Sequence, residues 1–282
     1  MKNLLYIVST FQKSGPINII INILKDIDRN EYRPLILSLA DESENKISAK
    51  NEFKELNIDV HSLRLTRFEG FLFGRSKIFK FCREMNIDTI HLVGFRADLI
   101  VQGNKFINYN IISSIFSNIF DDYTMLYGRF KGLVMAYMHI HSLKGKKIVA
   151  CSEFVKTELN KRTNLNFVVI LNGVSKNKFT IPNDIMKLNI RRQLKIDDSK
   201  KVFIFVGVLI KRKDPLTTIK GFINSRTGKE GYLIILGDGP LLAECKLFAK
   251  GYDSIRFMGN TSETLSYLHA ANYYISSSHS EG

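Results

Sequence analysis

Three loops in the sequence carry glycines or cations directly after an expected strand and before an expected helix. The first runs from Thr10 to Pro16 and contains Gly15. The second contains Gly207 followed by three consecutive cations, Lys211, Arg212 and Lys213. The third is Gly237-Asp238-Gly239-Pro240. Glycine lets a backbone approach a ligand closely, and a helix N-terminus offers free N–H groups to an anion. The three loops therefore suit a ligand that carries phosphate.

Each loop, taken alone, also has an ordinary structural interpretation. Gly15 alone fits a common strand-to-helix turn better than a ligand site, because one glycine is a weak motif. The cationic loop fits a solvated basic turn equally well. The glycines of the third loop fit a tight turn with positive φ. The final segment, Ser276 to Gly282, is by itself only a polar tail.

The elements that position these loops alternate between short apolar runs and segments of helical period. Strands are expected over 4–8, 35–39, 60–65, 89–93, 110–115, 147–151 and 167–171, and again over 202–206, 233–236, 255–258 and 273–276. Helices are expected over 17–24, 45–56, 75–85, 97–106, 128–143, 184–194 and 264–270, after Ser152, and from Asp214-Pro215 and Pro240 onward. This alternation predicts an α/β fold with right-handed βαβ units and mostly parallel sheets. The polar stretch 172–182 separates two such runs.

Composition limits the class of protein and its partners. The 282 residues carry a formal net charge of +14, which favours nucleic acid, an anionic membrane face or phosphorylated small molecules. The cations are spread along the chain without an RNA-binding motif, so no nucleic-acid partner is expected, and a solvated surface explains many of them equally well. The cysteines, Cys82, Cys151 and Cys245, are far apart and apolar in context, which fits a reducing cytoplasm. No apolar stretch approaches the ~20 residues that span a bilayer.

Together, the motifs resemble glycosyltransferase family 4. Residues 169–174 resemble its "v-i-x-N-G-v" segment, residues 205–222 its "v-G-R-L-x-x-x-K-G…a-F" segment and residues 233–240 its "l-x-i-x-G-d-G-p" segment. Residues 278–282 resemble the opening of its E-x7-E segment. Asp121-Asp122-Tyr123, with Tyr127-Gly128 and Lys131-Gly132, also looks like a subgroup that builds capsular and other surface polysaccharides.

The resemblance implies a GT-B fold with two Rossmann-like domains. Residues 1–175 would form the acceptor-side domain, and residues 176–282 an incomplete nucleotide-sugar-binding domain. Lys213 would neutralise the donor diphosphate, and Glu281 would hydrogen-bond the donor sugar. The other donor-binding residues would be Gly15, Gly207, Arg212, Gly237, Gly239 and Ser278. No metal and no cofactor is expected, because a UDP- or GDP-linked sugar is the substrate.

The chain departs from the family pattern at three places. Val208 replaces the usual arginine after the strand glycine, a loss for which Arg212 could compensate, and Phe116 replaces an expected histidine. The chain ends before the second glutamate of E-x7-E, so we expect this 282-residue chain to be inactive, weakly nucleotide-binding and prone to aggregation. Among the remaining histidines, His91 is placed to line a ligand cleft, whereas His139 and His141 are expected to be structural.

Three functions remain open at this level. The motif order favours a retaining transferase that acts on a glycan or lipid-linked acceptor in surface polysaccharide synthesis. Such an enzyme would be cytoplasmic and peripheral on the inner face of the membrane, held near anionic lipids by its charge. Sugar-nucleotide 2-epimerases share the fold, so the fold alone does not exclude them. A non-catalytic basic binding module is the third interpretation.

Overall fold

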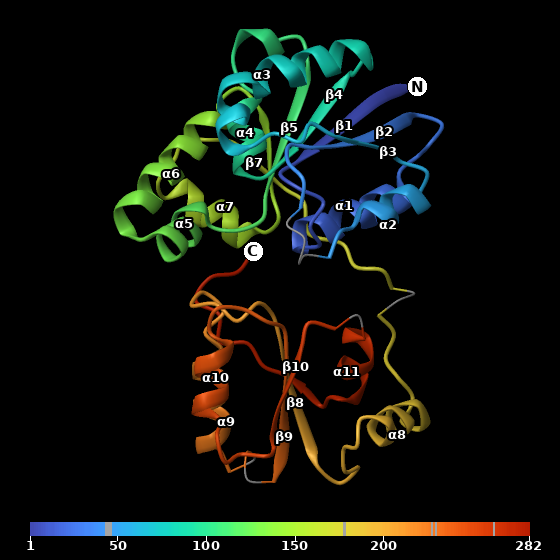
Figure 1. Cartoon of the computed structure of the whole chain (residues 1–282), viewed down its shortest axis with the longest axis vertical. Helices are drawn as coiled ribbons and strands as arrows, with labels where there is room; N and C mark the ends of the chain where they lie inside the picture. Colours follow the sequence, from blue (N-terminus) through green and yellow to red (C-terminus); the bar gives the residue numbers. More distant parts are fainter. Residues whose placement is uncertain (43–46, 177–178, 227, 229, 262) are drawn as a thin grey trace. The chain divides into compact units, whose positions relative to one another are not determined.

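The computed structural model describes residues 1–42, 47–176, 179–226, 228, 230–261 and 263–282. Contacts divide the chain into two compact units (Figure 1). The first unit comprises Met1–Val174 together with Gly282, and the second comprises Ser175–Glu281. The domain boundary expected from the sequence lies after residue 175, next to this division.

The first unit is built on a seven-stranded parallel sheet with the order β3-β2-β1-β4-β5-β6-β7. Its strands are β1 (Lys2–Val8), β2 (Tyr32–Ser38), β3 (Asp59–Ser62), β4 (Thr89–Val93), β5 (Asn110–Ile115), β6 (Lys147–Ala150) and β7 (Phe167–Val169). The interior strand β1 is buried from Leu4 to Val8, as its continuous apolar run predicts for a sheet covered on both faces.

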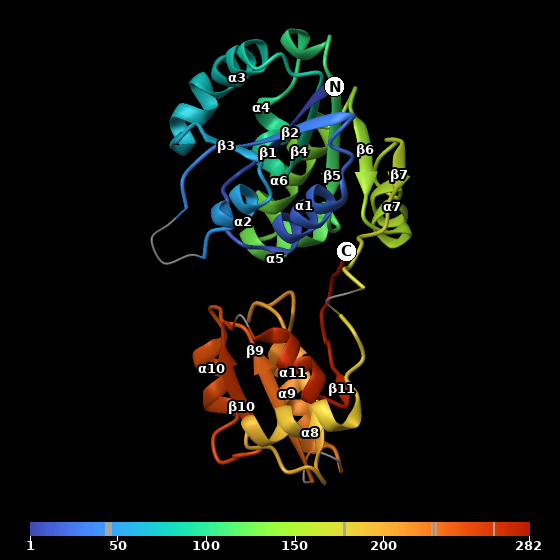
Figure 2. The ribbon, with the colours of Figure 1, turned by 90° about the vertical axis from the view of Figure 1, so that its right-hand side faces the viewer.

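Helices cover the two faces of this sheet (Figures 1 and 2). α1 (Gly15–Asp26) and α2 (Lys50–Glu55) pack on the face that carries Leu4, Tyr6 and Val8. α3 (Arg67–Glu84), α4 (Phe95–Ile100) and the short helix Asn104–Phe106 pack on the opposite face. α5 (Ile119–Tyr127), α6 (Arg129–Ser142) and α7 (Glu153–Asn160) continue that second layer over Ile115, Ile148 and Ala150.

Several expected elements have different bounds. The helix expected over 128–143 corresponds to α6, and a second helix that was not expected, α5, precedes it. Gly128 separates the two helices, because its φ of +81° is incompatible with helix. α3 begins eight residues earlier than expected, since Thr66 and Glu69 form a capping box in which the Thr66 hydroxyl accepts from the Glu69 N–H. Part of the helix expected over 45–56 lies outside the described residues.

The second unit contains a four-stranded parallel sheet with the order β10-β9-β8-β11. Its strands are β8 (Lys201–Val206), β9 (Gly231–Leu236), β10 (Ile255–Gly259) and β11 (Tyr273–Tyr274). α9 (Pro215–Asn224) and α10 (Leu242–Phe248) share one core with the sheet, and α8 (Asp184–Gln193) and α11 (Thr264–Ala270) share the other. The sheet is therefore covered on both faces, as in a Rossmann-like unit.

Candidate functional site

The two glycine loops of the second unit meet at the carboxyl ends of β8 and β9. Gly207 follows β8, and its N–H donates to the Leu236 carbonyl at 2.9 Å. Gly237 follows β9 with a φ of +130°, and a Cβ there would collide with the Gly207 carbonyl oxygen. A Cβ on Gly239 would lie 2.6 Å from the Leu209 carbonyl oxygen. Both positions therefore require glycine, because another backbone occupies the space of a side chain.

The cationic loop lies beside these glycines. A Cβ on Gly207 would lie 3.7 Å from the Lys213 Cδ, so the lysine stem crosses the end of β8. Asp214 follows and caps α9, with its carboxylate accepting from the Thr217 N–H at 3.2 Å. Its φ of +44° is left-handed and turns the chain sharply into the helix. Lys213 is thereby fixed next to the N-terminus of α9.

The segment that follows β11 runs along the same cationic loop. The His279 N–H donates to the Arg212 carbonyl, and the Arg212 guanidinium donates to the Ser280 carbonyl, each at 2.8 Å. The Ser277 hydroxyl donates to the Asp214 carbonyl at 2.6 Å. These bonds hold the backbone of 277–280 against the loop 212–214.

This arrangement places the two predicted catalytic side chains in contact. The Lys213 ammonium forms an ion pair with the Glu281 carboxylate, and the Arg212 guanidinium lies 3.6 Å from its other oxygen. Burial would raise the pKa of Glu281, but hydrogen bonds from Lys213 and Ser278 and the charges of Lys213 and Arg212 outweigh it and lower that pKa. Glu281 is therefore ionised at neutral pH and accepts hydrogen bonds.

Seven of the eight predicted site residues lie in one unit, and Gly15 lies in the other. Gly207, Arg212, Lys213, Gly237, Gly239, Ser278 and Glu281 all belong to the second unit. Gly15 opens α1 in the first unit, and a Cβ there would meet no heavy atom within 4 Å. Sterics therefore do not require glycine at position 15.

One residue that the sequence did not indicate, His279, completes the loop contacts. The His279 imidazole lies 3.1 Å from the Asp214 carboxylate. Burial alone would raise the pKa of the Asp214 carboxyl group. The hydrogen bonds from Thr217 and the nearby His279 outweigh burial, so the pKa of Asp214 is lowered. The Asp214-Pro215 pair predicted the cap of α9, whereas no feature of the sequence predicted that His279 contacts Asp214.

In the first unit, His91 and Phe116 line one cavity of about 210 Å³ together with apolar side chains that include Ile20, Ile112 and Val149. The His91 Nε2 lies 2.7 Å from the Ser114 hydroxyl. Burial lowers the pKa of His91 to about 4, although the charge of Asp98 opposes the shift. His91 is therefore neutral at neutral pH and lines a largely apolar space.

His139 belongs to a buried polar network under α6. Its ring nitrogens lie 2.8 Å from the Tyr123 hydroxyl and 3.0 Å from the Asp98 carboxylate, which also binds Lys146 at 3.2 Å. Burial would raise the pKa of Asp98, but the His139 hydrogen bond and the Lys146 charge lower it on balance. This network joins α4, α5 and α6, as the structural role expected for His139 requires, whereas His141 is exposed.

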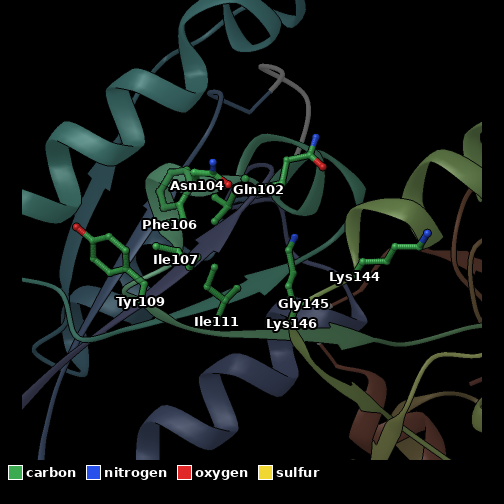
Figure 3. A pocket seen from close by; sticks show the side chains of 11 residues that line it. Gln102, Asn104, Phe106, Ile107, Tyr109, Ile111, Lys144, Gly145 and Lys146 are labelled. Carbon is green, nitrogen blue, oxygen red and sulfur yellow. The ribbon is translucent and has the colours of Figure 1, made fainter.

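A second cavity of the first unit, of about 190 Å³, lies between the helix Asn104–Phe106 and the turn that precedes β6 (Figure 3). Tyr109, Ile111 and Lys144 line it, and none of the predicted site residues does. Among the described residues, no group of His, Cys, Asp and Glu side chains could hold a metal ion. No helix in the described ranges is long and apolar enough to cross a membrane.

Comparisons with known proteins agree with this geometry. Residues 186–282 match the family described as "Glycosyl transferases group 1". No curated protein matches the sequence.

Solved structures resemble nearly the whole chain. The Anabaena protein Alr3699/HepE, solved with UDP and glucose, superposes with a TM-score of 0.76 at 16% identity, covering 98% of this chain and 74% of that one. The glycosyltransferase WaaG, involved in lipopolysaccharide biosynthesis, gives 0.74 at 10% identity, covering 98% and 75%. The sucrose-phosphate synthase of Thermosynechococcus elongatus gives 0.76 at 13% identity, covering 99% and 76%.

The family match lies on the unit that carries the glycine loops, the cations and Glu281. The structural matches extend the likeness to both sheets. Residues 186–282 therefore resemble a group 1 glycosyltransferase domain, and the whole chain has the fold of GT-B glycosyltransferases.

Proposed function

We propose that the second unit binds a nucleotide diphosphate sugar, UDP- or GDP-linked, and that the enzyme transfers the sugar with retention of anomeric configuration. The observation that carries this proposal is the contact of Lys213 and Arg212 with Glu281, beside the loop after β9 where only glycine fits at positions 237 and 239. Cations and open backbone recognise a diphosphate, and a carboxylate recognises sugar hydroxyls. HepE, solved with UDP and glucose, supports this class of donor.

Departure of the nucleotide builds negative charge on the β-phosphate and positive charge on the sugar ring. Lys213 and the N-terminus of α9 stabilise the phosphate charge, because both are held in place before the reaction. Glu281 accepts hydrogen bonds from the donor sugar. Arg212 holds the Glu281 segment through its bond to the Ser280 carbonyl and lies close enough to add positive charge. Lys213 takes the place that a divalent cation occupies in other transferases.

The acceptor in this proposal is a glycan or a lipid-linked glycan, and the pathway is surface polysaccharide synthesis. The resemblance of residues 121–132 to capsular enzymes supports this pathway, as does the likeness to WaaG, itself involved in lipopolysaccharide biosynthesis. The net charge of +14 favours a peripheral position on the anionic inner face of the cytoplasmic membrane.

A thermal-shift panel of UDP, GDP, ADP and their sugars tests the proposal. One diphosphate series should raise the melting temperature of the second unit, and Lys213→Ala should reduce that shift while the neighbouring exposed cation variant Lys211→Ala should not. Salt-sensitive binding to RNA or DNA without any nucleotide effect would instead identify a basic binding module.

Two further measurements separate the reaction types. Incubation with the stabilising nucleotide sugar and no acceptor should leave the sugar configuration unchanged, whereas an epimerase would convert it. Transfer to an acceptor should persist in EDTA, because Lys213 supplies the positive charge. Activity that is lost on chelation and restored by Mn²⁺ or Mg²⁺ would contradict this mechanism.

A further inference from the structure

Helix α6 carries an apolar stripe that the described residues of the first unit leave exposed. Phe130, Val134, Tyr137 and Met138 are 84%, 46%, 57% and 46% exposed. Their spacing of i, i+4, i+7 and i+8 places them on one helical face. The end of α5 adds Met125, Leu126 and Tyr127, which are also exposed. We call these seven side chains the α5–α6 surface.

The packing of the buried face of α6 holds the helix in the orientation that exposes the α5–α6 surface. The opposite face of α6 buries Gly132, Ala136, His139 and Ile140. Gly132 lets α5 approach closely, because a Cβ there would lie 2.5 Å from the Thr124 Cα. His139 is bound on both ring nitrogens, to Tyr123 and Asp98. α6 therefore cannot rotate to bury its apolar stripe without breaking this network.

The segment of chain that forms the α5–α6 surface and continues to β6 carries basic residues and no acidic ones. Between Tyr123 and Ser152 there is no aspartate or glutamate. The exposed cations of this stretch are Arg129, Lys131, Lys144 and Lys147. The Lys131 ammonium lies 5.7 Å from the centre of the Tyr127 ring, so its stem runs along the apolar surface. Asp121 and Asp122, in the first turn of α5, are engaged by Asn118 and Ser117.

A second apolar stripe lies on the same side of the sheet. Phe68, Phe71 and Leu72 of α3 are 70%, 84% and 49% exposed, and Arg75 follows at the same helical spacing. α4 packs between α3 and α6, and all three helices cover one face of the sheet (Figure 1). Aromatic and aliphatic side chains therefore recur along this side of the first unit.

From these observations we infer that the α5–α6 surface docks on an anionic lipid bilayer. Phe, Leu, Met and Val enter the boundary between headgroups and acyl chains, and tyrosine suits that boundary because one end is polar. Arg129 and Lys131, which flank Phe130 in the first turn of α6, meet the lipid phosphates. The inference deepens the peripheral position in the proposed function, and it does not depend on which sugar is transferred.

Sedimentation of the full chain with vesicles tests the inference. The chain should bind phosphatidylcholine vesicles that contain about 30% phosphatidylglycerol and should bind pure phosphatidylcholine far less. Binding should weaken in about 0.5 M NaCl, because salt screens the cations. Phe130→Ser with Tyr137→Ser, and separately Arg129→Glu with Lys131→Glu, should each lower the partition coefficient about 10-fold or more.

Matched controls come from the opposite face of the sheet. Ile23→Ser and Lys25→Glu change an exposed apolar side chain and an exposed cation of α1, and neither should alter vesicle binding. Each surface variant should keep the circular dichroism spectrum and the nucleotide-induced thermal shift of the parent chain. These readouts separate a failure of docking from a failure of the donor site.

Two results would overturn the inference. One is vesicle binding that the α5–α6 variants leave unchanged, since another surface would then be responsible. The other is absence of binding to anionic vesicles at low salt. If the parent chain is instead a dimer that the Phe130→Ser and Tyr137→Ser changes dissociate, the surface is a contact between two copies.

Discussion

Lys211 and Lys213 carry the same charge two residues apart, yet their surroundings differ. Lys213 lies against Gly207 and pairs with Glu281, whereas Lys211 is exposed. A fixed charge stabilises a transition state more than a mobile one, because no reorganisation is needed. Position, more than charge, is therefore the reason why we propose Lys213 and not Lys211 as the catalytic cation.

In the full-length enzyme, we expect Lys213→Ala to lower turnover about 100-fold or more, the scale of removing one preorganised electrostatic group. Steady-state rates of nucleotide release in the presence of acceptor would measure this. Lys211→Ala is the control and should remain within about 2-fold of the parent enzyme, because an exposed charge is screened. Equal losses in both variants would argue that general basicity, and not the Lys213 position, supports catalysis.

His91 allows a pH prediction. Its pKa is about 4 in the folded chain against 6.5 when free, so the unfolded chain takes up the proton first as the pH falls. The stabilising contribution is complete above pH 6.5 and is lost progressively toward pH 4, on the order of 3 kcal/mol in total. Stability of the parent should therefore fall more steeply with acid than that of His91→Gln.

Urea unfolding at several pH values between about 4 and 7 would measure this difference in the free energy of unfolding. The exposed His141→Gln variant should keep the pH profile of the parent chain. If the parent and His91→Gln profiles are parallel, His91 is not held neutral by burial.

At the scale of elements, the sequence identified the strands more reliably than the helix boundaries. β1 and β8 are continuous apolar runs, and burial on both faces leaves them little alternative. α5 was missed because its end depends on the positive φ of Gly128, and the sequence shows only a glycine between Tyr127 and Arg129. The start of α3 depends on the Thr66 capping box, which lies before the apolar period of that helix becomes clear.

The candidate site likewise contains residues that the local sequence predicted and residues that it did not predict. Lys213 and the glycines stand next to strands, so the topology rule for parallel sheets placed them correctly. His279 and Ser277 reach the cationic loop only because the segment after β11 folds back along it. That return depends on hydrogen bonds between residues more than sixty positions apart, which a local pattern does not reveal.

Two helical glycines give a prediction at this scale. Gly132→Ala should destabilise the chain by about 1–3 kcal/mol, because its Cβ would press against α5. Gly221→Ala in α9 should stabilise by up to about 1 kcal/mol, because its Cβ would meet nothing within 4 Å and alanine favours helix. Thermal unfolding of both variants beside the parent would show opposite shifts. Equal shifts would mean that the contact of α5 with α6 adapts freely.

At the scale of the whole molecule, the chain has separate cores in its two units. Ile36 and Leu37 lie in cores of the first unit, and Ile204 and Ile235 lie in cores of the second. Each sheet is covered by its own helices. Such units can unfold separately, so one melting temperature does not describe both.

Calorimetry should therefore resolve two unfolding transitions, and a bound nucleoside diphosphate should raise only the one that belongs to the second unit. At a ligand concentration of about 100 times the dissociation constant, the stabilisation is about 2.7 kcal/mol. Ile36→Val and Ile235→Val, which remove one buried methyl group from each unit, assign the transitions by lowering one each. Lys213→Ala should abolish the ligand shift without moving the first transition. A shift confined to the transition that Ile36→Val lowers would place the nucleotide in the first unit, and the contact of Lys213 with Glu281 would then serve structure and not donor binding.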